Sequence, residues 1–120
     1  MESSAQKKKK EIEDYLKGIV LNLPERPGCY QYFNENGEII YVGKAKNLKK
    51  RVSSYFNKEH ESRKTAILVS KIRDIKYIVV NSETDALLLE NNLIKQWKPR
   101  YNILLKDGTT YPSIIVTNEY

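Results

Sequence analysis

The stretch that decides the fold runs from Gly28 to Gly43 and reads GCYQYFNENGEIIYVG. Near its centre, Asn36 and Gly37 lie between two runs that are rich in Tyr, Phe and Ile. An Asn-Gly pair between such runs is the strongest short-range signal for a β-hairpin, because both residues tolerate the positive φ angles of a tight turn. The sequence therefore predicts two antiparallel strands joined at this point.

Two registers of this hairpin are open. A two-residue turn places Tyr32 opposite Tyr41 and Tyr30 opposite Gly43, whereas a four-residue loop at residues 34–37 places Tyr30 opposite Tyr41. Strand alternation puts the phenols of Tyr30 and Tyr41 on one face in either register. Gly43 has no side chain, so a ligand or another backbone could approach there. The alternative is an aromatic pair that only stabilises the hairpin.

A second signal is the carboxylate of Glu90. Ser82 and Asp85 resemble a capping box, which predicts a helix from this point to Trp97. Helical spacing places one carboxylate within a mostly apolar stripe that consists of Ala86, Glu90, Leu93, Ile94 and Trp97. A carboxylate in such a position needs a positive partner, a metal ion or a raised pKa. A structural salt bridge to Lys44, Arg51 or Arg100 is the alternative to a metal role.

The residues after the hairpin predict a basic helix. Asn47 is a suitable cap, and Leu48, Arg51, Val52 and Tyr55 then recur at helical spacing on the inward face. The planar guanidinium of arginine suits phosphate oxygens, although an arginine can also extend from such a position to solvent without any function. A functional site is favoured because tyrosines from the sheet, an inward arginine and an inward glutamate are all directed at one region.

These residues together resemble the GIY-YIG nuclease family. The resemblance rests on Gly-x-Tyr at 28–30, Tyr-x-Gly at 41–43, the helical Arg51 and the later Glu90. The runs 23–28, 41–48, 89–95, 98–102 and 105–107 with Tyr111-Pro112 are similar to the UvrC branch of that family. The resemblance implies an α+β fold in which helices flank a small three-stranded antiparallel sheet, and a metal-dependent DNA endonuclease that makes the 3′ incision beside a lesion in bacterial nucleotide excision repair.

The same resemblance implies the site residues. Those expected to be catalytic are Tyr30, Tyr41, Lys44, Arg51, Tyr55 and Asn102, and Glu90 is expected to bind one divalent cation, Mg²⁺ or alternatively Mn²⁺. Tyr30 is the candidate for orienting and deprotonating the attacking water, although a phenol with a pKa of about 10 is a poor base at neutral pH. Cys29 and Val42 stand where the family usually has Ile or Val, and Ile, and both should point away from the phenols.

The remaining chain predicts the rest of the fold. Helical patterns cover residues 11–21 and 63–72, and residues 74–80 are apolar on both faces, which predicts a central strand. Pro99 should end the Glu90 helix, Asp107-Gly108 should form a turn, and residues 113–117 could add an edge strand. We expect a basic N-terminal segment at 1–14 and the endonuclease domain at 15–120, as an N-terminal fragment of a longer chain.

The charge of the chain suits an anionic partner. The net charge is +6 and the pI is about 9.3, as expected for a protein that binds nucleic acid. The run Lys7–Lys10 reads as a solvated segment. The residues expected to contact DNA phosphates, or else to form a solvated face, are Lys46, Lys49, Lys50, Arg63 and Lys64.

The expected partners are damaged double-stranded DNA and, through regions outside this chain, UvrB; the domain is expected to be a monomer. The lone cysteine, Cys29, should be a buried strand thiol and fits the cytoplasm, and His60 reads as a loop residue rather than a ligand. No apolar stretch is long enough to cross a membrane.

Two other functions remain open. The first is a non-catalytic nucleic-acid-binding module in which Glu90 is salt-bridged to Arg51. The second is a freestanding GIY-YIG endonuclease for branched DNA, which the UvrC-like run 102–112 disfavours.

Overall fold

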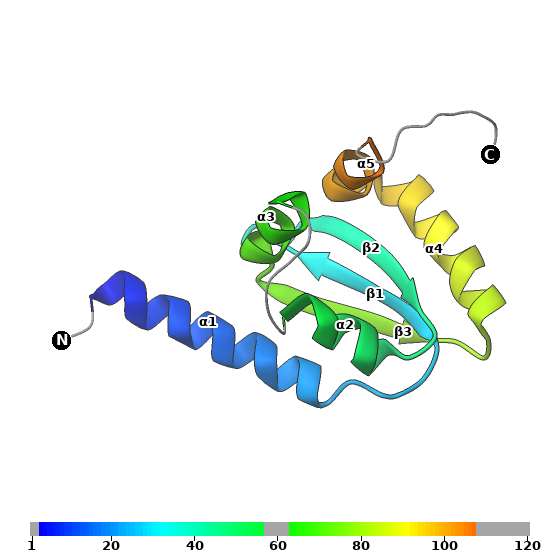
Figure 1. Ribbon diagram of the computed structural model, residues 1–120. Coiled ribbons are helices and arrows are strands. Elements are labelled where there is room, and N and C mark those ends of the chain that lie inside the picture. Colours follow the sequence, from blue (N-terminus) through cyan, green and yellow to red (C-terminus); the bar gives the residue numbers. More distant parts are fainter. Residues whose placement is uncertain (1–2, 57–62, 108–120) are drawn as a thin grey trace.

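The predicted hairpin forms most of a three-stranded antiparallel sheet in this computed structural model, which describes residues 3–56 and 63–107 (Figure 1). The elements follow in the order α1 (Ser4–Leu21), β1 (Gly28–Phe33), β2 (Ile39–Ala45), α2 (Leu48–Phe56), α3 (Arg63–Lys71), β3 (Asp74–Val79), α4 (Glu83–Trp97) and α5 (Arg100–Asp107). The α+β class and the flanked three-stranded sheet are confirmed. The described residues do not include Gly108 of the predicted turn, the edge strand predicted at residues 113–117, or His60.

The hairpin combines a three-residue loop with a bulge. The Gly37 N–H donates to the Asn34 carbonyl at 3.0 Å, and Gly37 has φ 79°, a positive value that glycine adopts without strain. Ile40 is the extra residue of the bulge, since Phe33 pairs with Ile39 while Tyr32 pairs with Tyr41. The strands therefore have the register of the shorter predicted turn, although neither predicted loop length is correct.

The prediction of residues 74–80 as the central strand is wrong. The strand order is β2-β1-β3, so β1 is central and β3 lies at an edge. Tyr77, Ile78 and Val79 remain 40–42% exposed. An apolar run shows that a strand can be buried but does not show how many strands pair with it, and here β1 pairs with a strand on each side.

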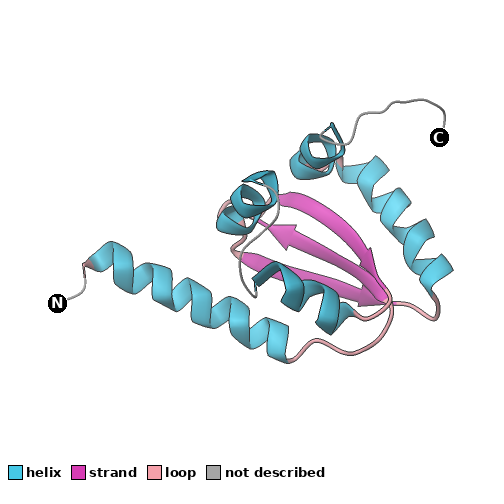
Figure 2. Cartoon of the chain, viewed as in Figure 1, coloured by secondary structure: helices cyan, strands magenta, loops and turns pink. Residues whose placement is uncertain are grey.

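Helices cover the two faces of the sheet. The main core includes residues from α1, α2 and α3 packed with Tyr30, Tyr32 and Ile75 of the sheet. On the opposite face α4 packs over β1 and β2, where the thiol of Cys29 donates to the Ala86 carbonyl at 3.1 Å. Cys29 is fully buried, as predicted. Figure 2 shows the sheet enclosed between these groups of helices.

Three features of the helices differ from the prediction. α1 begins at Ser4 instead of residue 11, because Ser3 and Gln6 form a capping box. α5 was not predicted. Trp97, expected on the inward stripe of α4, is 54% exposed. Among the helices of residues 3–56 and 63–107, none combines the length and apolar character that a membrane crossing needs.

Candidate active site

A cavity of about 700 Å³ opens where β2, α2 and α4 meet. It is lined by Tyr30, Tyr41, Gly43, Lys44, Ala45, Lys46, Asn47, Lys50, Arg51, Ser54 and Glu90. Five of the predicted catalytic and metal-binding residues therefore line one cavity. The tyrosines reach it from the face of the sheet that α2 covers, whereas α4, which carries Glu90, packs on the opposite face.

The tyrosines form a buried cluster behind the cavity. The Tyr30 and Tyr55 hydroxyls are hydrogen-bonded at 2.9 Å, and the ring centroids of Tyr30 and Tyr41 lie 6.3 Å apart. Burial is the main cause that raises the pKa of Tyr30, to about 12, and the pKa values of Tyr41 and Tyr55 are also raised mainly by burial. The neutral phenol is therefore the favoured form at these positions.

Arg51 joins α2 to this cluster. Its Nε donates to the Tyr30 hydroxyl at 3.4 Å, and its Cζ lies 5.4 Å from the centre of the Tyr55 ring. The helix that carries it begins as predicted, because the Lys50 N–H donates to the Asn47 side chain at 3.0 Å. Tyr55 does not line the cavity, but its hydroxyl is hydrogen-bonded to that of Tyr30, which does.

Glu90 lies half-buried on α4, a helix that is capped at Ser82 as predicted. Loss of solvent raises the pKa of its carboxyl, an effect opposed by the charge and backbone N–H of Lys44 and by the charge of Arg51. Within residues 3–56 and 63–107, Glu90 forms no ion pair, so the alternative to a metal role, a structural salt bridge to Lys44, Arg51 or Arg100, is not observed. A partly desolvated carboxylate that borders an open cavity remains available to a cation.

The donor set fits magnesium. Among the described residues no group of three or more His, Cys, Asp or Glu side chains converges, so Glu90 would be the main protein ligand. Mg²⁺ commonly keeps several waters and takes one or two carboxylates together with substrate phosphate oxygens. The cavity also contains Lys44, Lys46 and Lys50, whose charges favour an anionic substrate beside the cation.

Asn102 lies outside the cavity, at the outer edge of β2. Its side-chain Oδ1 accepts from the Val42 N–H at 2.9 Å, and its Nδ2 donates to the Val42 carbonyl at 2.8 Å. The amide therefore pairs with β2 in the way a further strand would. Because Tyr41 and Gly43 flank Val42, this contact helps to fix the strand that positions the cavity wall.

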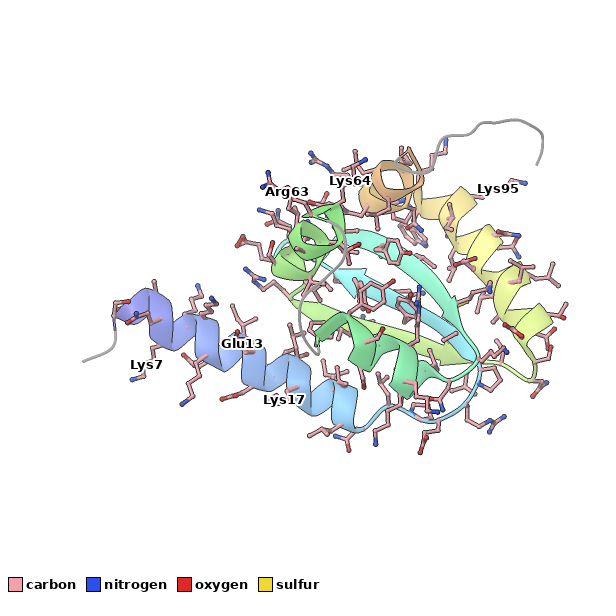
Figure 3. All side chains as sticks on the ribbon, viewed as in Figure 1. Lys7, Glu13, Lys17, Arg63, Lys64 and Lys95 are labelled. Atoms are coloured by element: carbon pink, nitrogen blue, oxygen red, sulfur yellow. The ribbon has the colours of Figure 1, made fainter. Side chains whose placement is uncertain are left out.

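The predicted phosphate-contacting residues do not all lie at the cavity. Lys46 and Lys50 line the cavity, whereas Lys49 does not. Arg63 and Lys64 lie at the start of α3, and the Lys64 ammonium donates to the Leu104 carbonyl of α5 (Figure 3). Ser54 also lines the cavity, although the sequence did not single it out; its spacing of three residues from Arg51 was the available signal.

This sheet and cavity define the GIY-YIG class of nuclease domain. Residues 26–103 match the family model described as the UvrC-like GIY-YIG domain, and the chain belongs to that family. It is 76% identical over 107 residues to the UvrABC system protein C of Bacteroides thetaiotaomicron and 70% identical over 106 residues to that of Porphyromonas gingivalis. These alignments cover 89% and 88% of this chain but only 18% of each relative, so the chain spans about a fifth of their length.

A solved structure agrees with the fold. The N-terminal GIY-YIG endonuclease domain of UvrC from Thermotoga maritima, described as bound to its catalytic divalent cation, magnesium, is 38% identical to this chain with a TM-score of 0.66. The match covers 72% of this chain and 94% of the other.

Proposed function

We propose that this domain hydrolyses a phosphodiester bond in one strand of DNA. The observation that carries the proposal is that Glu90 faces the same cavity as Tyr30, Tyr41 and Arg51, without an ion pair among the described residues that would make it structural. The similar domain from Thermotoga maritima is bound to magnesium. We propose that Glu90 holds Mg²⁺, or Mn²⁺ in its place, in this chain.

The residues around the cavity suit an in-line attack by water on phosphorus. Arg51 offers a planar set of donors to the phosphate oxygens as negative charge builds there. The Tyr30 hydroxyl, fixed by Tyr55 and Arg51, orients the attacking water. Because burial favours the neutral phenol, we assign Tyr30 the orientation of the water and not the removal of its proton. As the new bond to phosphorus forms and the bond to the sugar oxygen breaks, the proton of the water passes through solvent in the open cavity to the departing oxygen.

The other residues support this arrangement. Lys44 and Tyr41 bind and orient the phosphate from β2, and Tyr55 holds the Tyr30 hydroxyl in place. Asn102 acts on the reaction through β2, since both polar groups of its amide are bonded to Val42. When bound, the divalent cation supplies positive charge that stabilises the departing oxygen.

We infer the biological setting from the family. The domain, proposed to span residues 15–120 after a basic segment at 1–14, makes the 3′ incision beside a lesion during nucleotide excision repair in the cytoplasm. Its substrate is damaged double-stranded DNA on which UvrB is loaded, UvrB binds regions outside this chain, and the domain itself is a monomer. The residues proposed to contact the phosphate backbone are Lys46, Lys49, Lys50, Arg63 and Lys64.

Nicking of damaged duplex DNA by the full-length parent, with its loading partner, tests the proposal. Glu90→Gln keeps the shape of the side chain but removes the charge, and it should lower the nicking rate by at least about 100-fold while DNA binding persists. Glu83→Gln, an exposed glutamate in the first turn of α4, is the matched control and should nick normally. Equal nicking by Glu90→Gln would instead favour the non-catalytic binding module.

A further inference from the structure

We propose that Lys8 and Lys9, on the N-terminal half of α1, contact the phosphate backbone of the duplex that flanks the cleavage site. This inference rests on the proposed function and extends it to a surface outside the catalytic cavity. It assigns a binding role to part of the lysine run that the sequence alone describes only as solvated.

The two halves of α1 differ in their packing. Leu16 and Val20 are buried in the core, whereas every residue from Ser4 to Glu11 is exposed. Figure 1 shows this N-terminal half extending past the sheet, at the end of the molecule away from α4. The capping box of Ser3 and Gln6 fixes the start of the helix. The free half is therefore a helical arm of about 12 Å, at 1.5 Å per residue.

The four lysines of the arm point in different directions. At 3.6 residues per turn, Lys8 and Lys9 lie on one side of the helix, and Lys7 and Lys10 lie on the other. Lys8 and Lys9 line a groove of about 1040 Å³ between α1, α2 and α3. The other charged side chains of this groove are Glu13, Lys17, Glu35 and Arg73, which leaves basic groups in excess.

The arm carries uncompensated positive charge. Within the part of the chain that the structure describes, Lys8 and Lys9 form no ion pair. An anion bound at this side of the arm would pair with these two charges, and DNA phosphate is the anion that the proposed substrate provides.

The groove and the catalytic cavity lie on the two sides of α2. Ser53 and Phe56 face the groove, whereas Lys50, Arg51 and Ser54 face the cavity. A duplex that crosses α2 can therefore meet Arg51 at one end and the arm at the other. The longest dimension of the chain, 55 Å, corresponds to about 16 base pairs at 3.4 Å each, so a duplex longer than this can span both the cavity and the arm.

The experiment compares two double variants with equal charge loss. Lys8→Gln/Lys9→Gln removes the two positive charges on the side of the helix that faces the groove. Lys7→Gln/Lys10→Gln removes the two positive charges on the opposite side of the same turn. Binding of the 120-residue chain to a 30-base-pair duplex is measured by fluorescence anisotropy between 50 and 200 mM salt, with EDTA present so that cleavage cannot contribute. Circular dichroism checks that both variants keep their helix content.

The expected results are specific to one side of the helix. Lys8→Gln/Lys9→Gln should weaken binding about tenfold at 100 mM salt and reduce the slope of log K against log salt by about 1.8, or 0.9 per lost phosphate contact. Lys7→Gln/Lys10→Gln should change both by much less.

Equal losses in the two double variants would overturn the inference, because they would show only the effect of net charge. Wild-type binding by Lys8→Gln/Lys9→Gln would also overturn it and would leave the groove to another occupant, such as an acidic helix of a protein. Both results would leave the proposed nuclease function intact, whereas failure of the unmodified chain to bind any duplex would count against both proposals.

Discussion

The ring of Tyr30 lies against the backbone of Gly43, its partner across the hairpin. A Cβ added at Gly43 would overlap the Cζ and the hydroxyl oxygen of Tyr30. The space that the missing side chain leaves, which the sequence suggested for a ligand or backbone, is therefore taken by the phenol. This contact places the Tyr30 hydroxyl beside Tyr55 and Arg51.

Gly43→Ala should displace this phenol. We expect a loss of about 1–3 kcal/mol in the free energy of unfolding, because the core around Tyr30 is already filled, together with a strong loss of nicking. Denaturant unfolding and the nicking assay measure the two effects. Gly18→Ala, in α1 with nothing within 4 Å of the added Cβ, is the control and should be neutral or stabilising. Wild-type stability and nicking in Gly43→Ala would show that the ring contact is unimportant.

Asn102→Ala should loosen the outer edge of β2. The change removes both hydrogen bonds to Val42, and we expect about 1–3 kcal/mol of destabilisation. Hydrogen exchange should show faster exchange at the Val42 amide, with smaller changes at amides of β1. Asn92→Ala, at an exposed position on α4, serves as the control. Unchanged protection of Val42 would contradict the role that we assign to Asn102.

Tyr32→Phe should stabilise the chain. Tyr32 is fully buried, and its hydroxyl has no hydrogen-bond partner among the described residues. Phenylalanine fills the same space without burying an unpaired hydroxyl, so the free energy of unfolding should rise by about 1–3 kcal/mol. Tyr55→Phe, which loses the hydrogen bond to Tyr30, should have the opposite effect in the same thermal or denaturant assay. A less stable Tyr32→Phe would show that the hydroxyl is satisfied.

Stability should fall at alkaline pH because of Tyr30. Its pKa rises from 10.0 to about 12 on folding, mainly because burial disfavours the phenolate. Below pH 10 the phenol is protonated in both states, so its full contribution is present. Between about pH 10 and 12 the unfolded chain loses the proton first, so stability declines by up to about 1.4 kcal/mol per pH unit.

Denaturant unfolding between pH 8 and 11 checks this dependence. Tyr30→Phe should show a shallower decline than the unmodified chain above pH 10. Tyr77→Phe removes a phenol that is 42% exposed on the neighbouring strand, and it should keep the slope of the unmodified chain. Identical slopes in all three proteins would contradict the assignment to Tyr30.

Local patterns predicted much of this molecule. The Asn-Gly signal gave the hairpin, the caps at Asn47 and Ser82 gave two helix starts, and alternation placed Tyr30 with Tyr41. What could not be predicted depends on long-range pairing. The edge position of β3 is decided by which strands pair with β1, and the bulge at Ile40 compensates for a loop length that local preferences left open.

The candidate site also combines features that local patterns predicted with features that depend on long-range packing. Helical spacing directed Arg51 and Glu90 inward, but it could not show that α4 packs on the face of the sheet opposite the tyrosines. Nor could it show that the Asn102 amide is bonded to Val42, since this contact joins residues that are 60 positions apart. The roles proposed for the site residues depend on these contacts.

The central claim is that Glu90 holds a divalent cation beside the tyrosine cluster. Crystals of the unmodified chain and of Glu90→Gln, both soaked in Mn²⁺, test it through the anomalous signal of the metal. We predict a peak within coordination distance, about 2.0–2.2 Å, of the Glu90 carboxylate, and no peak there in Glu90→Gln. A well-ordered Glu90 without a metal peak, or a peak that persists in Glu90→Gln, would contradict the account.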